Sequence, residues 1–240
     1  MKNSEKILAI IPARKGSKRI KNKNTIDFCG KPLIQWTFDS LKDIELIDKI
    51  VLTTDDNEVI KLGETLDYIE VPFIRPDHLS GDTAKSIDVI NHVLDFYREK
   101  KVFFDYIMLL QPTSPLRLKE DIVGAINMIL KKTNEIEAVV SVCESGHSPL
   151  WMNTLPDDLS MKEFINTKFT TSRSQDLPKY YRLNGAIFIS KISSFEKNLG
   201  FYGEKTFAYK MPISRSIDID TKIDLELGKI YMNENSKDNS

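Results

Sequence analysis

Short apolar runs rich in Val and Ile recur along this chain and alternate with segments of helical periodicity. Residues 83–100 show the clearest helical pattern, with apolar side chains at intervals of three and four residues, and residues 33–41 and 121–130 are similar. The runs that we interpret as buried strands are residues 7–12, 49–54, 69–74, 106–110, 138–142 and 186–189. This alternation predicts an α/β fold of the Rossmann-like kind, with a doubly wound, mostly parallel sheet that binds ligands at the carboxyl ends of its strands.

Residues 144–182 interrupt the alternation. They include three prolines and many polar residues, and their apolar clusters form no long periodic segment. The sequence therefore predicts one main domain, residues 1–143 and 183–240, into which residues 144–182 are inserted as a small lobe. We expect this lobe either to cover the substrate or to form a dimer contact.

The charged residues nearly balance, with 34 Lys and Arg against 35 Asp and Glu among 240 residues. Such a chain has no overall field that would hold nucleic acid or an anionic membrane, so we expect neither as a partner. Residues 1–6 are polar, and the apolar run of residues 7–11 is too short for a signal peptide or a spanning helix, which predicts a cytoplasmic protein. The two cysteines lie far apart, which disfavours a disulfide framework or a zinc site.

The loop after the first predicted strand, residues 13–24, is strongly basic. It carries six Lys and Arg side chains together with Gly16. Gly16 lets the backbone approach a ligand closely, main-chain N–H groups bind phosphate oxygens, and basic side chains neutralise a triphosphate. The loop has neither a Walker A pattern nor a G-x-G-x-x-G pattern, which disfavours ATPases and dehydrogenases. A basic loop is often only a solvated surface, but its position directly after a buried strand favours a phosphate site.

Two acidic residues, Asp218 and Asp220, alternate with isoleucines near the C-terminus. In an extended segment the two carboxylates share one face while the isoleucines anchor the other. Neighbouring carboxylates repel unless a cation lies between them, and Mg2+ suits this arrangement because it takes one or two protein carboxylates together with substrate phosphates. The alternative is that Asp220 caps a helix over residues 221–233 while Asp218 is solvated.

Three motifs together resemble one enzyme family. They are IIPARKGSKRIKNKN at residues 10–24 with GKPLI at 30–34, LLQPTSPLR at 109–117, and SIDID at 216–220. These motifs resemble the acylneuraminate cytidylyltransferases, the CMP-sialic acid synthetases, and the resemblance extends from about residue 6 to about residue 232. The related CMP-Kdo synthetases carry an Arg-x-Pro-Gly-Lys-Pro run after the first motif, which is absent here.

The resemblance implies the fold of the nucleotide-diphospho-sugar transferases and a specific reaction. CMP from CTP would be joined to the anomeric hydroxyl of a nonulosonic acid of the N-acetylneuraminic, legionaminic or pseudaminic type, with release of pyrophosphate. The family also implies a homodimer and Mg2+ as cofactor, with Mn2+ as a substitute, bound by Asp218 and Asp220. Two alternatives stay open, namely transfer to another acidic sugar such as Kdo, and a catalytically silent nucleotide-binding protein.

The resemblance also assigns roles to individual residues. The catalytic residues would be Arg14, Lys18 and Asp218, and the proton acceptor would be Asp218 itself or a hydroxide on the metal. Residues that bind the nucleotide would be Arg14, Lys18, Lys23, Asn24, Arg75, Asp82 and Ser86. In addition, Asp82 or Thr83 is predicted to cap the helix that follows.

Three residues would face the sugar, namely Gln111, Trp151 and Arg173. The Gln111 amide both donates and accepts hydrogen bonds, and the Arg173 guanidinium suits a carboxylate because it binds it through two parallel hydrogen bonds. Trp151 departs from the family pattern, since some members carry a lysine nearby. A pocket lined by Trp151 would favour an apolar or acetamido-bearing sugar tail, whereas the alternative places Trp151 in the core of the lobe.

Overall fold

A computed structural model describes residues 5–132 and 134–238, with the side chains of residues 236–238 left undescribed. The polar stretch at residues 1–6 is thus described only from Glu5. Six strands form one sheet in the order β4-β1-β5-β7-β6-β8, and β7 runs antiparallel to its two neighbours while the other neighbouring pairs are parallel. The strands are β1 (Ile7–Ala13), β4 (Lys49–Thr54), β5 (Tyr106–Leu109), β6 (Ala138–Glu144), β7 (Tyr181–Lys191) and β8 (Thr206–Lys210). The predicted doubly wound, mostly parallel sheet is confirmed.

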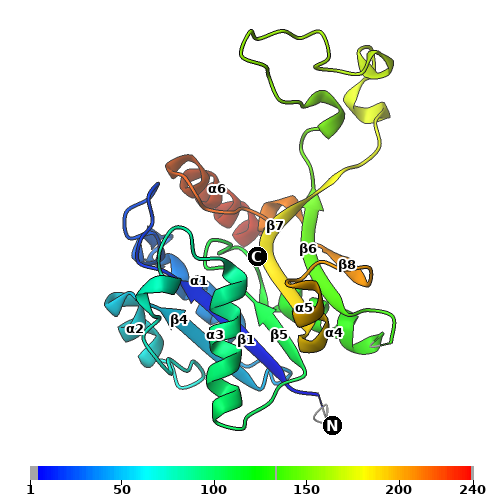
Figure 1. The fold of residues 1–240 in the computed structure, drawn as a ribbon. Helices are drawn as coiled ribbons and strands as arrows, with labels where there is room; N and C mark the ends of the chain where they lie inside the picture. The colour runs from blue at the N-terminus through cyan, green and yellow to red at the C-terminus, as the bar shows by residue number, and fades with distance from the viewer. Residues whose placement is uncertain (1–4, 133, 239–240) are drawn as a thin grey trace.

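Helices cover both faces of this sheet (Figure 1). One face packs against α1 (Leu33–Leu41), α2 (Asn57–Glu64) and α4 (Lys119–Lys131), and the other against α3 (Ser86–Glu99) and α5 (Ile192–Asn198). Strand β1 shows the reason, because Ile7, Ala9 and Ile11 face one layer while Leu8 and Ile10 face the other, and all five are fully buried. A strand covered on both faces is apolar throughout, which explains the continuous run in the sequence.

A third, smaller core lies beneath the loops at the carboxyl end of the sheet. It joins Ile20 and Phe28 to Ile219 and to Leu225 of α6 (Lys222–Asp238). The short hairpin of β2 (Asp27–Phe28) and β3 (Lys31–Pro32) supplies Phe28. This cluster ties the basic loop after β1 to the acidic run before α6, although the two segments are about 200 residues apart in the sequence.

The predicted strand over residues 69–74 is wrong. Two isolated bridges link this segment to β4, one at Glu70 and one at Ile74, and no continuous ladder forms between them. Pro72 lies between the bridges, and a proline has no N–H to donate to a ladder. The segment therefore follows the edge of the sheet without becoming a full strand.

The predicted cap of the helix after Asp82 is also wrong. Helix α3 begins at Ser86 rather than at residue 83, and its N-cap position is Lys85, without a side-chain capping bond. Asp82 instead forms ion pairs with basic side chains. The sequence pattern also missed β8, whose side chains are mostly half-buried or exposed, and it found only part of β7.

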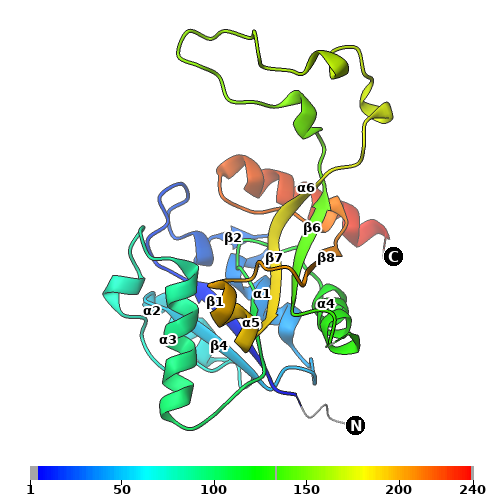
Figure 2. The ribbon, with the colours of Figure 1, turned by 45° about the vertical axis from the view of Figure 1, so that its right-hand side comes forward.

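Residues 145–180, called the lobe below, leave the sheet after β6 and return as β7 (Figure 2). They fall within residues 144–182, and the predicted division into a main domain and an inserted lobe stays a prediction. The lobe contains three short 3-10 helices, η3 (Pro149–Trp151), η4 (Thr167–Phe169) and η5 (Ser174–Asp176), and none of its residues is fully buried. In both views it extends away from the body of the molecule. Within the described residues, the helices are all too short or too polar to cross a membrane.

Candidate active site

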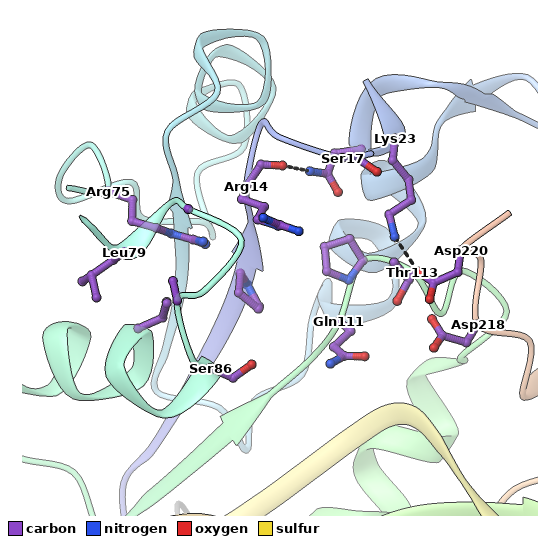
Figure 3. Close-up of a pocket in the computed structure, with 16 residues that line it drawn as sticks. Arg14, Ser17, Lys23, Arg75, Leu79, Ser86, Gln111, Thr113, Asp218 and Asp220 are labelled. Atoms are coloured by element: carbon purple, nitrogen blue, oxygen red, sulfur yellow. Dashed lines mark hydrogen bonds and ion pairs between the residues drawn. The ribbon is translucent and has the colours of Figure 1, made fainter. Parts of the chain in front are cut away.

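A cavity of about 360 Å³ opens at the carboxyl ends of β1 and β5. Figure 3 shows Arg75 and Ser86 on one side of it and Asp218 and Asp220 on the other. Eight of the sequence-predicted site residues line this cavity, namely Arg14, Lys23, Asn24, Arg75, Ser86, Gln111, Asp218 and Asp220. The parallel strands bring them together because their carboxyl ends meet at one edge of the sheet.

The basic loop is held against the end of β1 by Asn24. This side chain is buried, and its Nδ2 donates a hydrogen bond of 3.0 Å to the carbonyl oxygen of Arg14. Asn22, two residues before Asn24, has a φ of 52°, which lies in the left-handed region. This conformation turns the chain into η1 (Lys23–Thr25). The loop is therefore shaped by its own backbone and by the small core beneath it.

At the outer end of this loop, Asp82 pairs with two cations. Its carboxylate lies 2.6 Å from the Arg14 guanidinium and 2.6 Å from the Lys18 ammonium. Hydrogen bonds from Lys18 and then from Arg14 hold the pKa of Asp82 below its usual value. Lys18 and Asp82 stand at the rim rather than among the lining residues, so their predicted contact with the nucleotide stays a prediction.

At the inner end, Asp220 pairs with two other cations. Its carboxylate lies 2.8 Å from the half-buried Lys23 ammonium and 3.2 Å from the exposed Arg19 guanidinium. The alternative role of Asp220 as a helix cap is wrong, because Thr221 and Asp224 form reciprocal hydrogen bonds at the start of α6. Asp220 is thus free to face the cavity.

Asp218 is the more buried of the two carboxylates. Burial raises its pKa, a hydrogen bond with Thr113 opposes that shift, and the charge of Asp220 reinforces it. Its Oδ1 atom is buried without a hydrogen-bond partner in the described structure. On the opposite face Ile219 is fully buried and Ile217 packs against the same cluster, as the alternating pattern predicted. An unsatisfied carboxylate oxygen beside a second carboxylate is suited to a cation.

Arg75 is almost fully buried at the other side of the cavity, with 4% of its surface exposed. Its Nε donates to the Thr53 hydroxyl at 3.2 Å, and its Nη2 donates to the Thr53 carbonyl. Burial lowers the pKa of Arg75 to about 10. The guanidinium is therefore anchored to the end of β4 and held at the cavity wall.

Gln111 and Gly185 meet at the floor of the cavity. Gly185 has φ of 74°, and a Cβ atom there would lie 2.8 Å from Gln111 Oε1 and 3.7 Å from Asp218 Oδ2. A glycine is required for both reasons, since other residues rarely adopt this φ and would displace the Gln111 amide. The contact of Gly185 with Gln111 depends on the pairing of β5 with β7.

A second, apolar cavity of about 250 Å³ adjoins the first. The two share Ser86 and Gln111 in their walls. Aromatic side chains dominate the remaining wall, namely Phe188, Phe195, Phe201 and Tyr202. Sequence reasoning missed this cavity, because it predicted a strand over residues 186–189 and assigned no structure to residues 190–202.

Trp151 and Arg173 lie on the lobe and line neither cavity. The Trp151 indole donates a hydrogen bond of 3.3 Å to the Phe169 carbonyl, so within one chain Trp151 belongs to the packing of the lobe. Arg173 is exposed and pairs with its neighbour Asp176 at 3.1 Å. The predicted grouping of these two residues with Gln111 therefore does not form within a single chain.

Known proteins resemble this chain over most of its length. A family model described as Cytidylyltransferase matches residues 8–237. The chain is 36% identical over 240 residues to the CMP-N,N'-diacetyllegionaminic acid synthase of Legionella pneumophila, covering 97% of the chain and 98% of that protein. It is 34% identical over 222 residues to the N-acylneuraminate cytidylyltransferase of Escherichia coli, covering 92% of the chain but 51% of that protein, so the chain spans about half its length.

Two further likenesses complete the comparison. The pseudaminic acid cytidylyltransferase of Campylobacter jejuni is 31% identical, with 94% of the chain and 95% of that protein covered. The solved structure of CMP:2-keto-3-deoxy-manno-octonic acid synthetase complexed with CTP superposes with a TM-score of 0.67 at 16% identity, covering 96% of this chain and 100% of that one. At that identity the superposition shows the fold alone. The match to the family model over nearly its whole length shows that the chain belongs to the cytidylyltransferase family.

Proposed function

We propose that this protein transfers CMP from CTP to the anomeric hydroxyl of a nonulosonic acid. The hydroxyl oxygen attacks the α-phosphorus, a new P–O bond forms, the bond to the bridging oxygen breaks, and pyrophosphate leaves. The hydroxyl proton passes to a base, for which Asp218 is our candidate, because its carboxylate lines the cavity. Otherwise the protein has to position two substrates and neutralise charge.

The charged groups of the cavity suit a triphosphate. Arg14 and Lys23 line the cavity, and Lys18 stands at its rim beside Arg14. Each of these cations is ion-paired with a carboxylate in this structure. On binding, the triphosphate would replace that carboxylate as the anionic partner of the cation. Arg75 and Ser86 line the opposite wall, where they would contact the nucleoside.

Mg2+ fits the acidic side of the cavity. Asp218 and Asp220 would bind it, and the buried, unsatisfied Oδ1 of Asp218 supports this assignment. In the described residues no group of three or more His, Cys, Asp or Glu side chains is arranged to hold a metal, so the other ligands of the ion would have to be phosphates and water. When bound, the ion would supply positive charge to the phosphates.

The apolar cavity beside Gln111 carries the assignment of the sugar. Nonulosonic acids of the three types named above bear acylamino groups, whose methyl ends gain from burial against aromatic rings. Kdo carries hydroxyls in place of these groups, and hydroxyls lose hydrogen bonds to water in such a cavity. Gln111 lies in the wall between the polar and apolar cavities, where it would contact the sugar between its reacting end and its acyl group. We therefore favour a nonulosonic acid over Kdo.

We also propose that the protein is a homodimer. The lobe has no fully buried residue, and several large apolar side chains are more than half exposed on it, namely Met152, Leu155, Leu159 and Met161. A segment that cannot bury its apolar surface within its own chain gains from a partner. A second copy would also provide the only route by which Arg173 could reach a sugar, because the described part of the chain holds Arg173 outside its own cavities. The predicted cytoplasmic location remains a prediction.

A pyrophosphate-release assay tests the function. CTP should be turned over with at least one of N-acetylneuraminic, legionaminic and pseudaminic acids, and more slowly with Kdo. Phe201→Ser, which puts a hydroxyl into the apolar cavity, should raise the KM for the acylated sugar more than the KM for CTP. Turnover with Kdo that exceeds turnover with all three acylated acids would overturn the sugar assignment, and no turnover with any sugar would overturn the activity.

A further inference from the structure

Arg117 is the largest fully buried side chain in the protein, with 2% of its surface exposed. It belongs to the LLQPTSPLR motif but does not line the cavity that contains Gln111. Within the described residues its guanidinium forms no ion pair, because the nearby Asp121 carboxylate is bound by Arg215 at 2.8 and 3.0 Å. Burying a cation without a counter-ion is costly, and burial lowers the pKa of Arg117 to about 9. Its hydrogen bonds have to offset this cost.

Those hydrogen bonds join three separate elements. Nη1 donates to the Ala186 carbonyl at 2.7 Å and to the Gln111 carbonyl at 3.3 Å, and Nη2 donates to the Thr37 hydroxyl of α1 at 2.9 Å. Ala186 belongs to β7, and Gln111 follows directly after β5. The Nη1 atom of Arg117 thus fixes the distance between the segment after β5 and strand β7.

The position of this link in the sheet is informative. Strands β5 and β7 pair antiparallel up to Leu109, which lies opposite Phe188. Continued in the same register, the ladder would bring Gln111 opposite Ala186, but the described ladder ends before that point. The Arg117 guanidinium takes over there by donating to both carbonyls. It therefore links β7 to Gln111 at the point where the backbone hydrogen bonds between the strands have ended, and the side chain of Gln111 enters the cavity.

We propose that Arg117 is a positioning residue, which holds the backbone of Gln111 against β7 so that its amide lies over Gly185 and beside Asp218. The proposal rests on the proposed function. Gly185 allows the Gln111 amide to lie close to β7, because Gln111 Oε1 occupies the space that a Cβ atom at Gly185 would need. Arg117 sets this contact from behind through the two carbonyls. Arg117 thereby holds the main chain of Gln111, while Gly185 leaves the space that its side-chain amide occupies.

A double-mutant cycle tests this role. Arg117→Lys keeps the charge but cannot reach both carbonyls and Thr37, so kcat/KM for the sugar should fall by about a hundredfold, the loss expected from a misplacement of about 1 Å. The KM for CTP should change less than about twofold, because the nucleotide side is bound by other elements. In a Gln111→Ala background the same substitution should cost less than about threefold, since the group that Arg117 positions is already absent. Equal losses in both backgrounds would overturn the proposal.

Thr37→Val is the matched control. It removes the bond to Nη2 but leaves Nη1 with its two carbonyls, so it should lower the melting temperature while the KM for the sugar stays within about twofold of the wild-type value. A sugar KM that rises equally in Thr37→Val and Arg117→Lys would mean that Arg117 acts through general stability, which overturns the positioning role.

Hydrogen exchange supplies a readout that needs no sugar. In Arg117→Lys, exchange should rise in residues 110–117 and 184–188 but not in β1, and a uniform or absent rise would overturn the link between the two strands. The wild-type assay separates the two claims. If the wild type turns over no nonulosonic acid, the proposed function fails, and the exchange pattern alone then decides whether Arg117 holds the strands together.

Discussion

The side of the cavity that we propose binds the nucleotide, called the nucleotide side below, and the inserted lobe differ in how their residues are held. Arg75 is bonded to Thr53 of β4, Asn24 is bonded to the Arg14 carbonyl just after β1, and Arg14 is bonded to Asp82 of a neighbouring loop. All three line one cavity. Arg173 and Trp151 lie on a lobe without a single fully buried residue, bonded only to their lobe neighbours. If the proposed roles hold, one chain supplies the residues for the nucleotide, whereas Arg173 would need a second chain to reach the sugar.

The largest expected effect concerns Asp218 and Asp220, the acidic pair in the cavity. Asp218→Asn and Asp220→Asn should each lower kcat by at least about a hundredfold, because a carboxylate that binds a cation contributes several kcal/mol of charge stabilisation. The melting temperature should change little, since neither carboxylate supports the packing of the core. Steady-state kinetics across a range of Mg2+ concentrations, with thermal unfolding as the control, checks this. A fully active double Asn variant would remove the metal assignment.

The next expected effect concerns the choice of nucleobase. CTP should be preferred over UTP by at least about a hundredfold, because a buried polar site such as that around Arg75 rejects ligands that leave its groups unpaired. Rates with CTP, UTP, ATP and GTP at a saturating sugar concentration measure this preference. Equal rates with CTP and UTP would show that the nucleotide side is less specific than its fixed geometry suggests.

A mixing experiment sharpens the contrast with the lobe. If the lobe of one subunit completes the site of the other, Asp218→Asn and Arg173→Ala should each be weakly active alone. Mixed in equal amounts and allowed to exchange, they should recover about a quarter of wild-type activity, because half of the dimers are mixed and each mixed dimer has one intact site. Absence of recovery despite verified subunit exchange would place Arg173 in its own chain's site or outside any site.

A milder substitution separates charge from geometry at the same residue. Arg173→Lys should raise the sugar KM by about tenfold, since an ammonium cannot form the two parallel hydrogen bonds of a guanidinium, and should leave the KM for CTP nearly unchanged. Trp151→Lys serves as the companion variant on the lobe. A sugar ranking that is unchanged in Trp151→Lys would agree with its packing against Phe169, whereas a changed ranking would bring Trp151 into a sugar site.

The smallest expected effect concerns the rim. Asp82→Asn removes the carboxylate that competes with a triphosphate for Arg14 and Lys18. Because all three side chains are partly exposed, the KM for CTP should fall by no more than about fivefold. The fall should disappear at high salt, which screens surface charge. A rise in the KM for CTP would instead show that Asp82 orients the two cations or contacts the nucleotide itself, as the sequence resemblance suggested.

The sequence alone determined the fold class and, among the seven residues predicted to bind the nucleotide, five that line the cavity. Fully buried strands such as β1 are apolar throughout, and chemically active residues follow directly after their carboxyl ends, so their convergence can be predicted from strand order. The Asp218 and Asp220 alternation could be interpreted for the same local reason, because side chains in an extended segment alternate between two faces. The interruption over residues 144–182 was equally visible as a loss of periodicity.

Only the tertiary structure decided the remaining features. The segment over residues 69–74 was apolar enough for a strand, but its pairing depended on Pro72 and on a position at the sheet edge. Asp82 was a plausible helix cap until Arg14 and Lys18 were found within ion-pair distance of it. The contact of Gln111 with Gly185 and the link through Arg117 join residues about 70 positions apart, and no local pattern reports such a distance. Local sequence encodes burial and periodicity, whereas contacts between distant segments exist only once the strands have paired.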